Sequence, residues 1–344
     1  MTDDDGSWVV ILSSSQFWHN YRHEASALSV YHAARALGVP DARIVLMIAG
    51  GAACDPRNPR AGHIWNSASH AHELYPCDIA VDFRGEDVTA STFIGVLTDS
   101  LPATTPAARR LHSSRSSNVL VYMTGHGGDG FFKFRDAHEL TASELAHAIT
   151  QMHAQKRYGK LLLLIDTCQA ATMAEELGGA EAVSLAASER GESSFAKEVD
   201  PAVGVAVSDR FTFHVHRFLL ALMPPPRLHE QERGAAGRVS NGIDGSLAAL
   251  EGVLRRSRVL STVTRGEHGW DGSAVQLLDF LRAPPRARAS APPLAGEQPA
   301  AWARGAEGGV AEGAAARRGC RSGGSRSLAS WRRAEESAFW GEAH

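Results

Sequence analysis

Short, uninterrupted apolar runs recur along the first two thirds of the chain, separated by stretches with helical spacing. The two strongest runs, at residues 118–123 and 161–165, contain no charged residue. Such runs are typical of parallel strands, which are buried on both faces and joined by crossover helices. The sequence therefore predicts an α/β fold, a three-layer sandwich with a mostly parallel six-stranded sheet flanked by helices. The expected strands cover residues 8–12, 44–48, 79–83, 118–123, 161–165 and 182–187.

The composition changes along the chain and predicts three regions. Residues 1–223 carry the strand and helix pattern, and a run of three prolines at 224–226 marks its end. Residues 283–344 are dominated by Ala, Gly, Arg, Ser and Pro and contain few large apolar side chains. Because such a segment buries too little apolar surface to offset its ordering entropy, we expect a disordered low-complexity tail. Residues 224–282 are expected to form a divergent, partly structured extension.

Charge and cysteine content exclude several classes of protein. The 35 Lys and Arg against 38 Asp and Glu give a net charge of −3, which argues against a nucleic-acid partner. The four cysteines form no C-x-x-C pair of the kind that zinc sites use. The apolar run at residues 8–12 is too short for a signal peptide, and no run approaches the roughly 20 residues of a membrane span. As written, the sequence predicts a soluble chain.

Two reactive residues follow the two strongest strands. His126 lies within Thr124-Gly-His-Gly-Gly128, and Cys168 lies within Asp166-Thr-Cys-Gln-Ala170. Ligands of open parallel sheets bind beyond the carboxyl ends of the strands, and a thiol nucleophile needs a base such as imidazole. Either residue alone is better explained as an inert buried thiol or a turn residue, but the pair favours a Cys–His dyad. The amides of Gly127 and Cys168 are candidate oxyanion donors.

Longer motifs surround both residues and extend from about Trp8 to Met223. Through them the chain resembles the legumain family (C13) of caspase-like cysteine peptidases, and within it the catalytic subunits of glycosylphosphatidylinositol (GPI) transamidase. The matching stretches are Tyr122–Gly130, Ile165–Ala170, Phe17–Arg22, Ile44–Met47, Ala53–Pro59, Leu140–Thr141, Asp200–Gly204 and Asp209–Phe213.

The resemblance implies a transamidation reaction. Cys168 would be the nucleophile, His126 the general base and later acid, and Asn20 the residue that positions the histidine. Cys168 would cleave the C-terminal signal of a precursor protein through a thioester, and the acyl group would pass to the ethanolamine amine of a GPI lipid. Two alternatives remain: a stand-alone legumain-like asparaginyl endopeptidase, which uses water as the acceptor, and a non-catalytic scaffold subunit.

The resemblance also implies two binding sites. Ser188, Glu192 and Ser194 match the region where the family reads the attachment residue of its substrate. Asp41, the carbonyl of Ile44 and Asp82 match a structural calcium site, but Ala80 replaces an expected carboxylate, and fewer oxygen ligands weaken calcium binding. The chemistry itself requires no cofactor.

The partners implied by the resemblance are the other subunits of the transamidase. Cys54 matches the cysteine that forms a disulfide with a PIG-T-like subunit; an unpaired loop thiol is the alternative. The remaining partners are membrane subunits, precursor proteins and a GPI lipid, on the lumenal face of an endoplasmic reticulum membrane complex. Family members resemble proteins with an N-terminal signal and a C-terminal span. Since neither is recognisable here, an incomplete or frame-shifted gene model is a further hypothesis.

Overall fold

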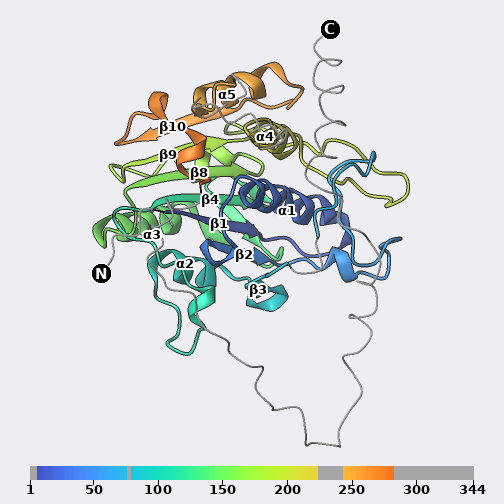
Figure 1. Cartoon of the computed structure of the whole chain (residues 1–344), viewed down its shortest axis with the longest axis horizontal. Helices are drawn as coiled ribbons and strands as arrows, with labels where there is room; N and C mark the ends of the chain where they lie inside the picture. Colours follow the sequence, from blue (N-terminus) through green and yellow to red (C-terminus); the bar gives the residue numbers. More distant parts are fainter. Residues whose placement is uncertain (1–5, 76–78, 224–242, 283–344) are drawn as a thin grey trace, which may run out of the picture.

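The centre of the molecule is one seven-stranded sheet. The computed structural model describes residues 6–75, 79–223 and 243–282 of the chain (Figure 1). The strand order is β10-β9-β8-β4-β1-β2-β3, and neighbouring strands run parallel except for β10 against β9. The strands are β1 Ser7–Ser13, β2 Ile44–Ile48, β3 Phe83–Arg84, β4 Asn118–Thr124, β8 Lys160–Asp166, β9 Ala182–Ala186 and β10 Thr264–His268.

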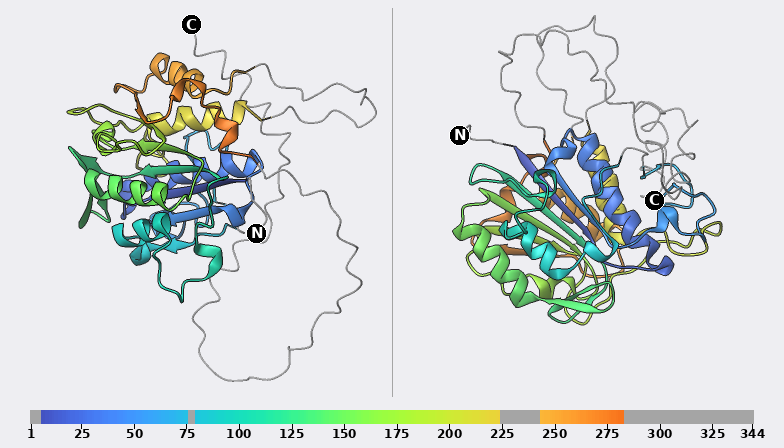
Figure 2. Two further views of the ribbon diagram at one scale, coloured as in Figure 1. Left: turned by 90° about the vertical axis from the view of Figure 1, so that its left-hand side faces the viewer. Right: turned by 90° about the horizontal axis from the view of Figure 1, so that it is seen from below.

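Helices cover both faces of the sheet (Figure 2). One face packs against α1 (Tyr21–Ala36), α4 (Arg210–Ala221) and α5 (Leu247–Arg256), and the other against α2 (Ala90–Thr98) and α3 (Ala142–Ala154). Successive residues of a strand point to opposite faces, so a strand buried on both sides must be apolar throughout. In β1, Val9 and Ile11 contribute to the core under α1, whereas Val10 and Leu12 contribute to the core under α2 and α3.

The predicted fold class, a mostly parallel sheet between helical layers, is confirmed, but the expected count of six strands is one too low. The additional strand is β10, which pairs antiparallel with β9 at the edge of the sheet. Its sequence, Thr-Arg-Gly-Glu-His, has no apolar alternation. An edge strand with partly exposed side chains does not require one, so the hydrophobic pattern gave no signal. The expected outer strand at residues 79–83 is reduced to the two-residue β3.

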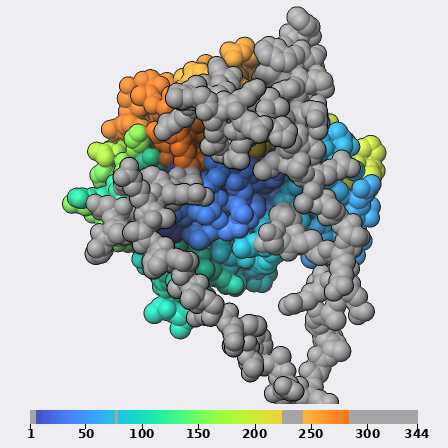
Figure 3. All heavy atoms as spheres, in the orientation of Figure 1, coloured from blue at the N-terminus to red at the C-terminus, as the bar shows by residue number. Residues whose placement is uncertain are grey.

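Residues 243–282 pack against the same body as residues 6–223. Helix α5 lies against α4, and β10 extends the central sheet. In Figure 3 the orange atoms of this segment lie against those of the sheet and its helices. The division into regions expected from composition stays a prediction, since residues 224–242 and the expected disordered tail at 283–344 lie outside the described residues.

A small antiparallel sheet follows β4 and leads into α3. It consists of β5 (Gly127–Gly128), β6 (Phe131–Phe134) and β7 (His138–Thr141). Thr141 then begins α3 with a capping box, in which its hydroxyl accepts from the amide of Glu144 and the Glu144 carboxylate accepts from the amide of Thr141. The loop that carries His126 is therefore held between the central sheet and this smaller one.

Candidate active site

The two predicted reactive residues follow neighbouring strands at the same edge of the sheet. Thr124 at the end of β4 is the register partner of Asp166 at the end of β8. His126 and Cys168 each lie two residues beyond these partners, and both are partly exposed. The register therefore places the loops that carry them at the same carboxyl edge, where parallel sheets bind their ligands.

The loops that carry these residues touch at Gly127. A β-carbon at this position would lie 2.6 Å from Thr167 Oγ1 and 2.9 Å from the carbonyl oxygen of Phe131. No side chain fits there without displacing the residue that precedes Cys168. A glycine after His126 thus permits the close approach of the two loops, and it sets the amides of Gly127 and Cys168 at the same edge. Their oxyanion role stays a prediction.

His126 is oriented by Asn20. Its Nε2 lies 2.8 Å from Asn20 Oδ1, while Asn20 Nδ2 donates to the carbonyl of Gln16 at 2.6 Å. Because the amide oxygen can only accept, Nε2 carries the proton, and Nδ1 is left with its lone pair. Burial lowers the pKa of His126, and the positive charge of Arg22 lowers it further, so the ring is neutral at pH 7. A neutral ring with an available nitrogen can act as a base.

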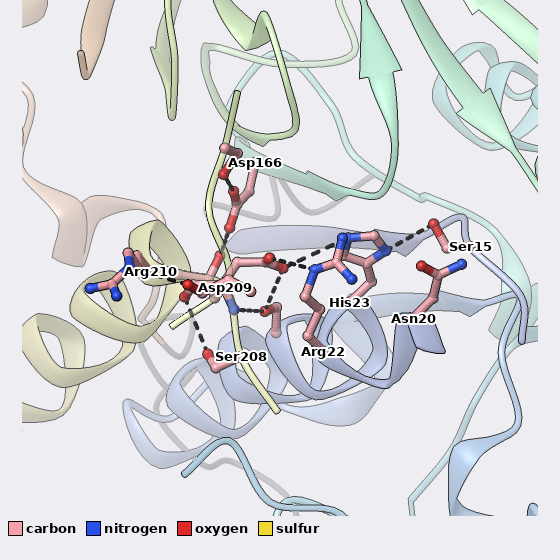
Figure 4. Close-up of polar contacts among 12 residues, drawn as sticks. Ser15, Asn20, Arg22, His23, Asp166, Ser208, Asp209 and Arg210 are labelled. Atoms are coloured by element: carbon pink, nitrogen blue, oxygen red, sulfur yellow. Dashed lines mark hydrogen bonds and ion pairs between the residues drawn. The ribbon is translucent and has the colours of Figure 1, made fainter. Parts of the chain in front are cut away.

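A second histidine packs against the first. The ring of His23 meets that of His126 edge to face, with centroids 4.9 Å apart. His23 Nδ1 lies 2.9 Å from Ser15 Oγ, and its Nε2 faces Asp209 at 3.9 Å (Figure 4). Burial lowers the pKa of His23 well below its ordinary value, so this ring is a neutral packing partner. It narrows the space in which the His126 ring can turn.

Beneath the two loops lies a cluster that we call the buried carboxylate cluster: Asp166 and Asp209 with Arg22, Ser194 and Thr212. Asp166 accepts from Ser194 Oγ at 2.8 Å and from Thr212 Oγ1 at 2.5 Å. Asp209 accepts from Arg22 Nε at 3.0 Å (Figure 4). Burial raises the pKa of both carboxyls, to about 7 for Asp209, where the charge of Asp166 adds to the effect. The cluster ties α1 and α4 to the loop of Cys168.

Of this cluster, only Ser194 was predicted from the sequence as a site residue. Arg22, Asp166 and Asp209 lie inside matching motifs, where they served only as markers of resemblance. The charge of these three residues was the available signal. Since a buried charge requires a partner, charged residues inside such motifs could have indicated a buried ion pair near the site. Local patterns could not pair them, since the contact between Arg22 and Asp209 spans 187 positions.

The residues predicted to form the substrate pocket surround the Cys168 loop and brace it. The buried Ser188 hydroxyl donates to the carbonyl of Thr167 at 2.8 Å and accepts from the amide of Ala170 at 3.1 Å. The Glu192 carboxylate accepts from the amide and hydroxyl of Thr262 at 2.7 and 2.8 Å. Ser194 is bonded to Asp166, as described above. These contacts make the residues part of the frame of the loop, and their role in reading a substrate stays a prediction.

Comparison with known proteins decides the family. The model of the Peptidase C13 family matches residues 7–217. The chain belongs to the peptidase C13 family. The C13 chain is 46% identical over 218 residues to a protein named GPI-anchor transamidase from Bos taurus. The matched stretch covers 63% of this chain and 55% of the relative. The corresponding protein of Schizosaccharomyces pombe is 46% identical over 213 residues, with coverage of 62% and 56%.

The C13 chain spans about half the length of these curated relatives. A solved structure, caspase-1 from Spodoptera frugiperda, has a TM-score of 0.40 at 10% identity and covers 76% of this chain and 88% of its own. Among the residues that the structure describes, no helix is both long and apolar enough to cross a membrane.

The two predicted calcium-binding carboxylates of this C13 chain already have partners within the chain, and the calcium site stays a prediction. Asp41 accepts from Tyr31 Oη at 2.7 Å and pairs with Arg35, and Asp82 Oδ2 accepts from the amide of Leu46 at 2.9 Å. Burial raises the pKa of Asp82 to about 6, so this carboxyl is still mostly ionised at pH 7. Ala80 supplies no side-chain oxygen. Within the described ranges, no group of three or more acidic, His or Cys side chains is placed to hold a metal.

Cys54 lies on the surface of the C13 domain. It closes a short 3-10 helix, Ala52–Cys54, and its thiol is exposed and unpaired within the described chain. A surface thiol is available to a second chain, as the predicted intersubunit disulfide requires. Cys77 and Cys320 lie outside the described residues.

Proposed function

We propose that this chain is the catalytic subunit of a GPI transamidase, with Cys168 and His126 as its dyad. The observation that carries the proposal is the register of β4 and β8, which sets the two residues at one edge of the sheet. The hydrogen bond from His126 to Asn20 supports it, since it leaves Nδ1 as the basic nitrogen. The name of the relatives, GPI-anchor transamidase, supplies the reaction.

In the first half of the reaction, His126 Nδ1 takes the thiol proton of Cys168 as the sulfur attacks the carbonyl carbon at the attachment site of a precursor protein. A C–S bond forms, and the carbonyl oxygen becomes an oxyanion. The Gly127 and Cys168 amides face this charge, and preorganised donors of this kind supply a large part of the catalysis of acyl transfer. When the C–N bond breaks, His126 returns its proton to the departing amine of the C-terminal signal, and a thioester remains.

In the second half, the ethanolamine amine of a GPI lipid attacks the thioester carbon. A C–N bond forms and the C–S bond breaks. An ammonium group brings three N–H protons: the product amide retains one, the thiolate of Cys168 recovers one through His126, and one is released to solvent. The same oxyanion donors serve both halves. The two halves need no metal ion and no redox cofactor.

The proposal places the chain among other subunits. Its partners would be a PIG-T-like subunit linked through Cys54, membrane subunits, precursor proteins and a GPI lipid, at the lumenal face of the endoplasmic reticulum. Exposure of the Cys54 thiol supports the disulfide. In this assembly, Ser188, Glu192 and Ser194 would hold the loop against which the attachment residue is read.

Rescue of cells that lack their catalytic subunit tests the proposal. The chain, targeted to the endoplasmic reticulum, is expected to restore surface display of a GPI-anchored reporter, and Cys168→Ala is expected to abolish it. Glu139→Gln, on the exposed strand β7, is the matched control and should rescue fully. Rescue by Cys168→Ala would overturn the enzymatic role and favour a scaffold. Cys168-dependent cleavage of an Asn-containing peptide by the isolated chain, without rescue, would favour an endopeptidase that uses water.

A further inference from the structure

A cavity of about 340 Å³ is lined by residues of β9, β10 and the segment that follows Cys168. Strands β9 and β10 form one edge of the central sheet (Figure 1). Its apolar wall consists of small side chains, including Ala171, Ala174 and Ala186. Ala171 and Ala174 also belong to or adjoin the core under α3, so the cavity opens on that face. The buried carboxylate cluster involves α1 and α4, on the opposite face. Cys168 lies at the edge between the two.

The floor of the cavity is polar and is kept open by a glycine. Ser184 Oγ lies 3.1 Å from His268 Nε2, and both side chains line the cavity. Burial lowers the pKa of His268, so its ring is neutral and shares one hydrogen bond with the serine hydroxyl. A β-carbon at Gly266 would lie 2.6 Å from Ser184 Oγ and 2.7 Å from His268 Nε2. A larger residue on β10 would therefore close the space over this pair.

The rim carries charges of both signs. Glu175, Glu189 and Arg190 are its charged lining residues apart from the neutral histidine, so the lining has a net negative charge. Arg190 pairs with Glu175 and with Asp129 outside the cavity. Glu189 accepts from Thr264 Oγ1 at 3.2 Å. Two carboxylates beside one guanidinium match a ligand with an ammonium group and a phosphate. The alanine wall suits the short aliphatic stem between them.

The cavity is close enough to Cys168 to hold the amine that attacks a thioester on this residue. Ala171 is three residues from Cys168, so their Cα atoms lie within about 11 Å of each other. The turn that carries Glu189 and Arg190 is fastened beside the nucleophile: Gln169 donates its amide to the carbonyl of Glu192 at 2.9 Å, and its side chain accepts from the amide of Gly191 at 2.8 Å. A ligand at this rim is within reach of an acyl group on Cys168.

We propose that this cavity is the acceptor site, binding the terminal ethanolamine phosphate with its ammonium at Glu189 and Glu175 and its phosphate at Arg190. The inference rests on the proposed function and adds the place from which the amine attacks. The amine loses one proton to solvent and one to the Cys168 sulfur through His126 as the C–N bond replaces the C–S bond.

Binding to the full chain carrying Cys168→Ala tests the site without chemistry. O-phosphorylethanolamine, titrated by calorimetry, is expected to bind with a dissociation constant that Glu189→Gln raises about three- to tenfold. Arg190→Gln should weaken phosphorylethanolamine in the same range and should not weaken ethanolamine, because it removes the phosphate partner and frees Glu175 from its ion pair. Glu139→Gln is the matched control, an exposed carboxylate away from the cavity, and should change neither. Absence of saturable binding, or equal effects of Glu189→Gln and Glu139→Gln, would overturn the proposal.

Two further arms separate this inference from the proposed function and identify the amine. N-acetyl-lysine amide offers an ammonium without a phosphate; binding as tight as that of phosphorylethanolamine would overturn the assignment. With active chain, Glu189→Gln should lower the ratio of ethanolamine adduct to hydrolysis product about three- to tenfold while peptide cleavage continues. Continued cleavage with an unchanged ratio overturns the acceptor site alone. If the unmodified chain shows no Cys168-dependent cleavage, the proposed function is overturned. The calorimetric titration then decides by itself whether the cavity binds phosphorylethanolamine.

Discussion

Asn20 Oδ1 accepts the Nε2 proton of His126 at 2.8 Å, and the backbone amide of Asn20 is itself held by the carbonyl of Phe17 at 3.0 Å. The tautomer of the candidate base thus depends on a turn at the end of β1. That turn is strained, because Phe17 has φ 70° and ψ 152°, a conformation nearly restricted to glycine. The chain holds the base in one orientation at a cost in backbone energy.

Removal of the Asn20 side chain should impair turnover more than binding. In Asn20→Ala the His126 ring loses its acceptor and samples both tautomers, so we expect kcat to fall about 100-fold with little change in KM. Asn20→Asp retains an acceptor and adds a charge that raises the pKa of His126, so the acidic limb of kcat/KM should move upward by about one pH unit. Asn118→Ala, which also loses one hydrogen bond to a carbonyl but lies at the opposite end of β4, is the control. Equal losses in both alanine variants would contradict the positioning role.

Relief of the strain at Phe17 should raise stability and lower activity. The Phe17 ring is 63% exposed, so its removal sacrifices little burial. Phe17→Gly should stabilise the fold by about 1 kcal/mol, as strain relief exceeds the added unfolded-state entropy, while kcat falls because the turn no longer fixes Asn20. Phe17→Ala keeps the strain and should not stabilise. Leu260→Gly, at another exposed position with φ 69°, is expected to stabilise without a loss of kcat. Urea unfolding and initial rates measure both effects; a stabilised Phe17→Gly with full activity would show that the strain serves no function.

The central strands could be predicted from sequence because their signals are local, while the dyad that follows two of them stays a prediction. Strands β4 and β8 are buried on both faces, so their apolar runs matched the observed bounds to within a residue. Pairing of Asp209 with Arg22 could not be predicted this way, since it depends on how α4 packs on α1. The same holds for β10, which is placed by β9 rather than by its own polar sequence. Elements whose position is decided by a distant partner leave no periodic pattern.

The buried carboxylate cluster should give the fold a pH dependence opposite to that of ordinary salt bridges. The pKa of Asp209 is raised from 3.8 to about 7, so the folded state retains a proton that the unfolded state releases. Stability from this group is present in full below pH 3.8 and is lost as pH rises toward 7. Relative to the native chain, Asp209→Asn should therefore become less destabilising between pH 4 and 7, by at most about 1.4 kcal/mol per pH unit.

Urea unfolding of the native chain and of Asp209→Asn at several pH values measures this difference. The buried histidines His23 and His216 have lowered pKa values, so both reduce the stability of the fold as pH falls. The contribution of His216 cancels in the difference, which therefore reports Asp209 together with its coupling to Asp166 and to His23, whose Nε2 lies 3.9 Å from Asp209. A difference that is constant across the range, or that grows with pH, would show that Asp209 is ionised in the folded chain throughout.

Loss of the Ser188 hydroxyl should loosen the loop of Cys168, the candidate nucleophile, rather than alter substrate choice. Ser188 joins the carbonyl of Thr167 to the amide of Ala170, so it closes the loop around Cys168 from below. Ser188→Ala leaves two buried backbone groups short of a partner, and we expect about 1–3 kcal/mol of lost stability together with a lower kcat. A pocket residue would instead change KM and the ranking of substrates with Asn, Ser or Gly at the attachment position. Kinetics on such a peptide series decide between the two roles. The control is Ser114→Ala, which removes a partly buried hydroxyl beyond the other end of the sheet. A changed ranking of the substrates at unchanged kcat would assign Ser188 to the substrate pocket.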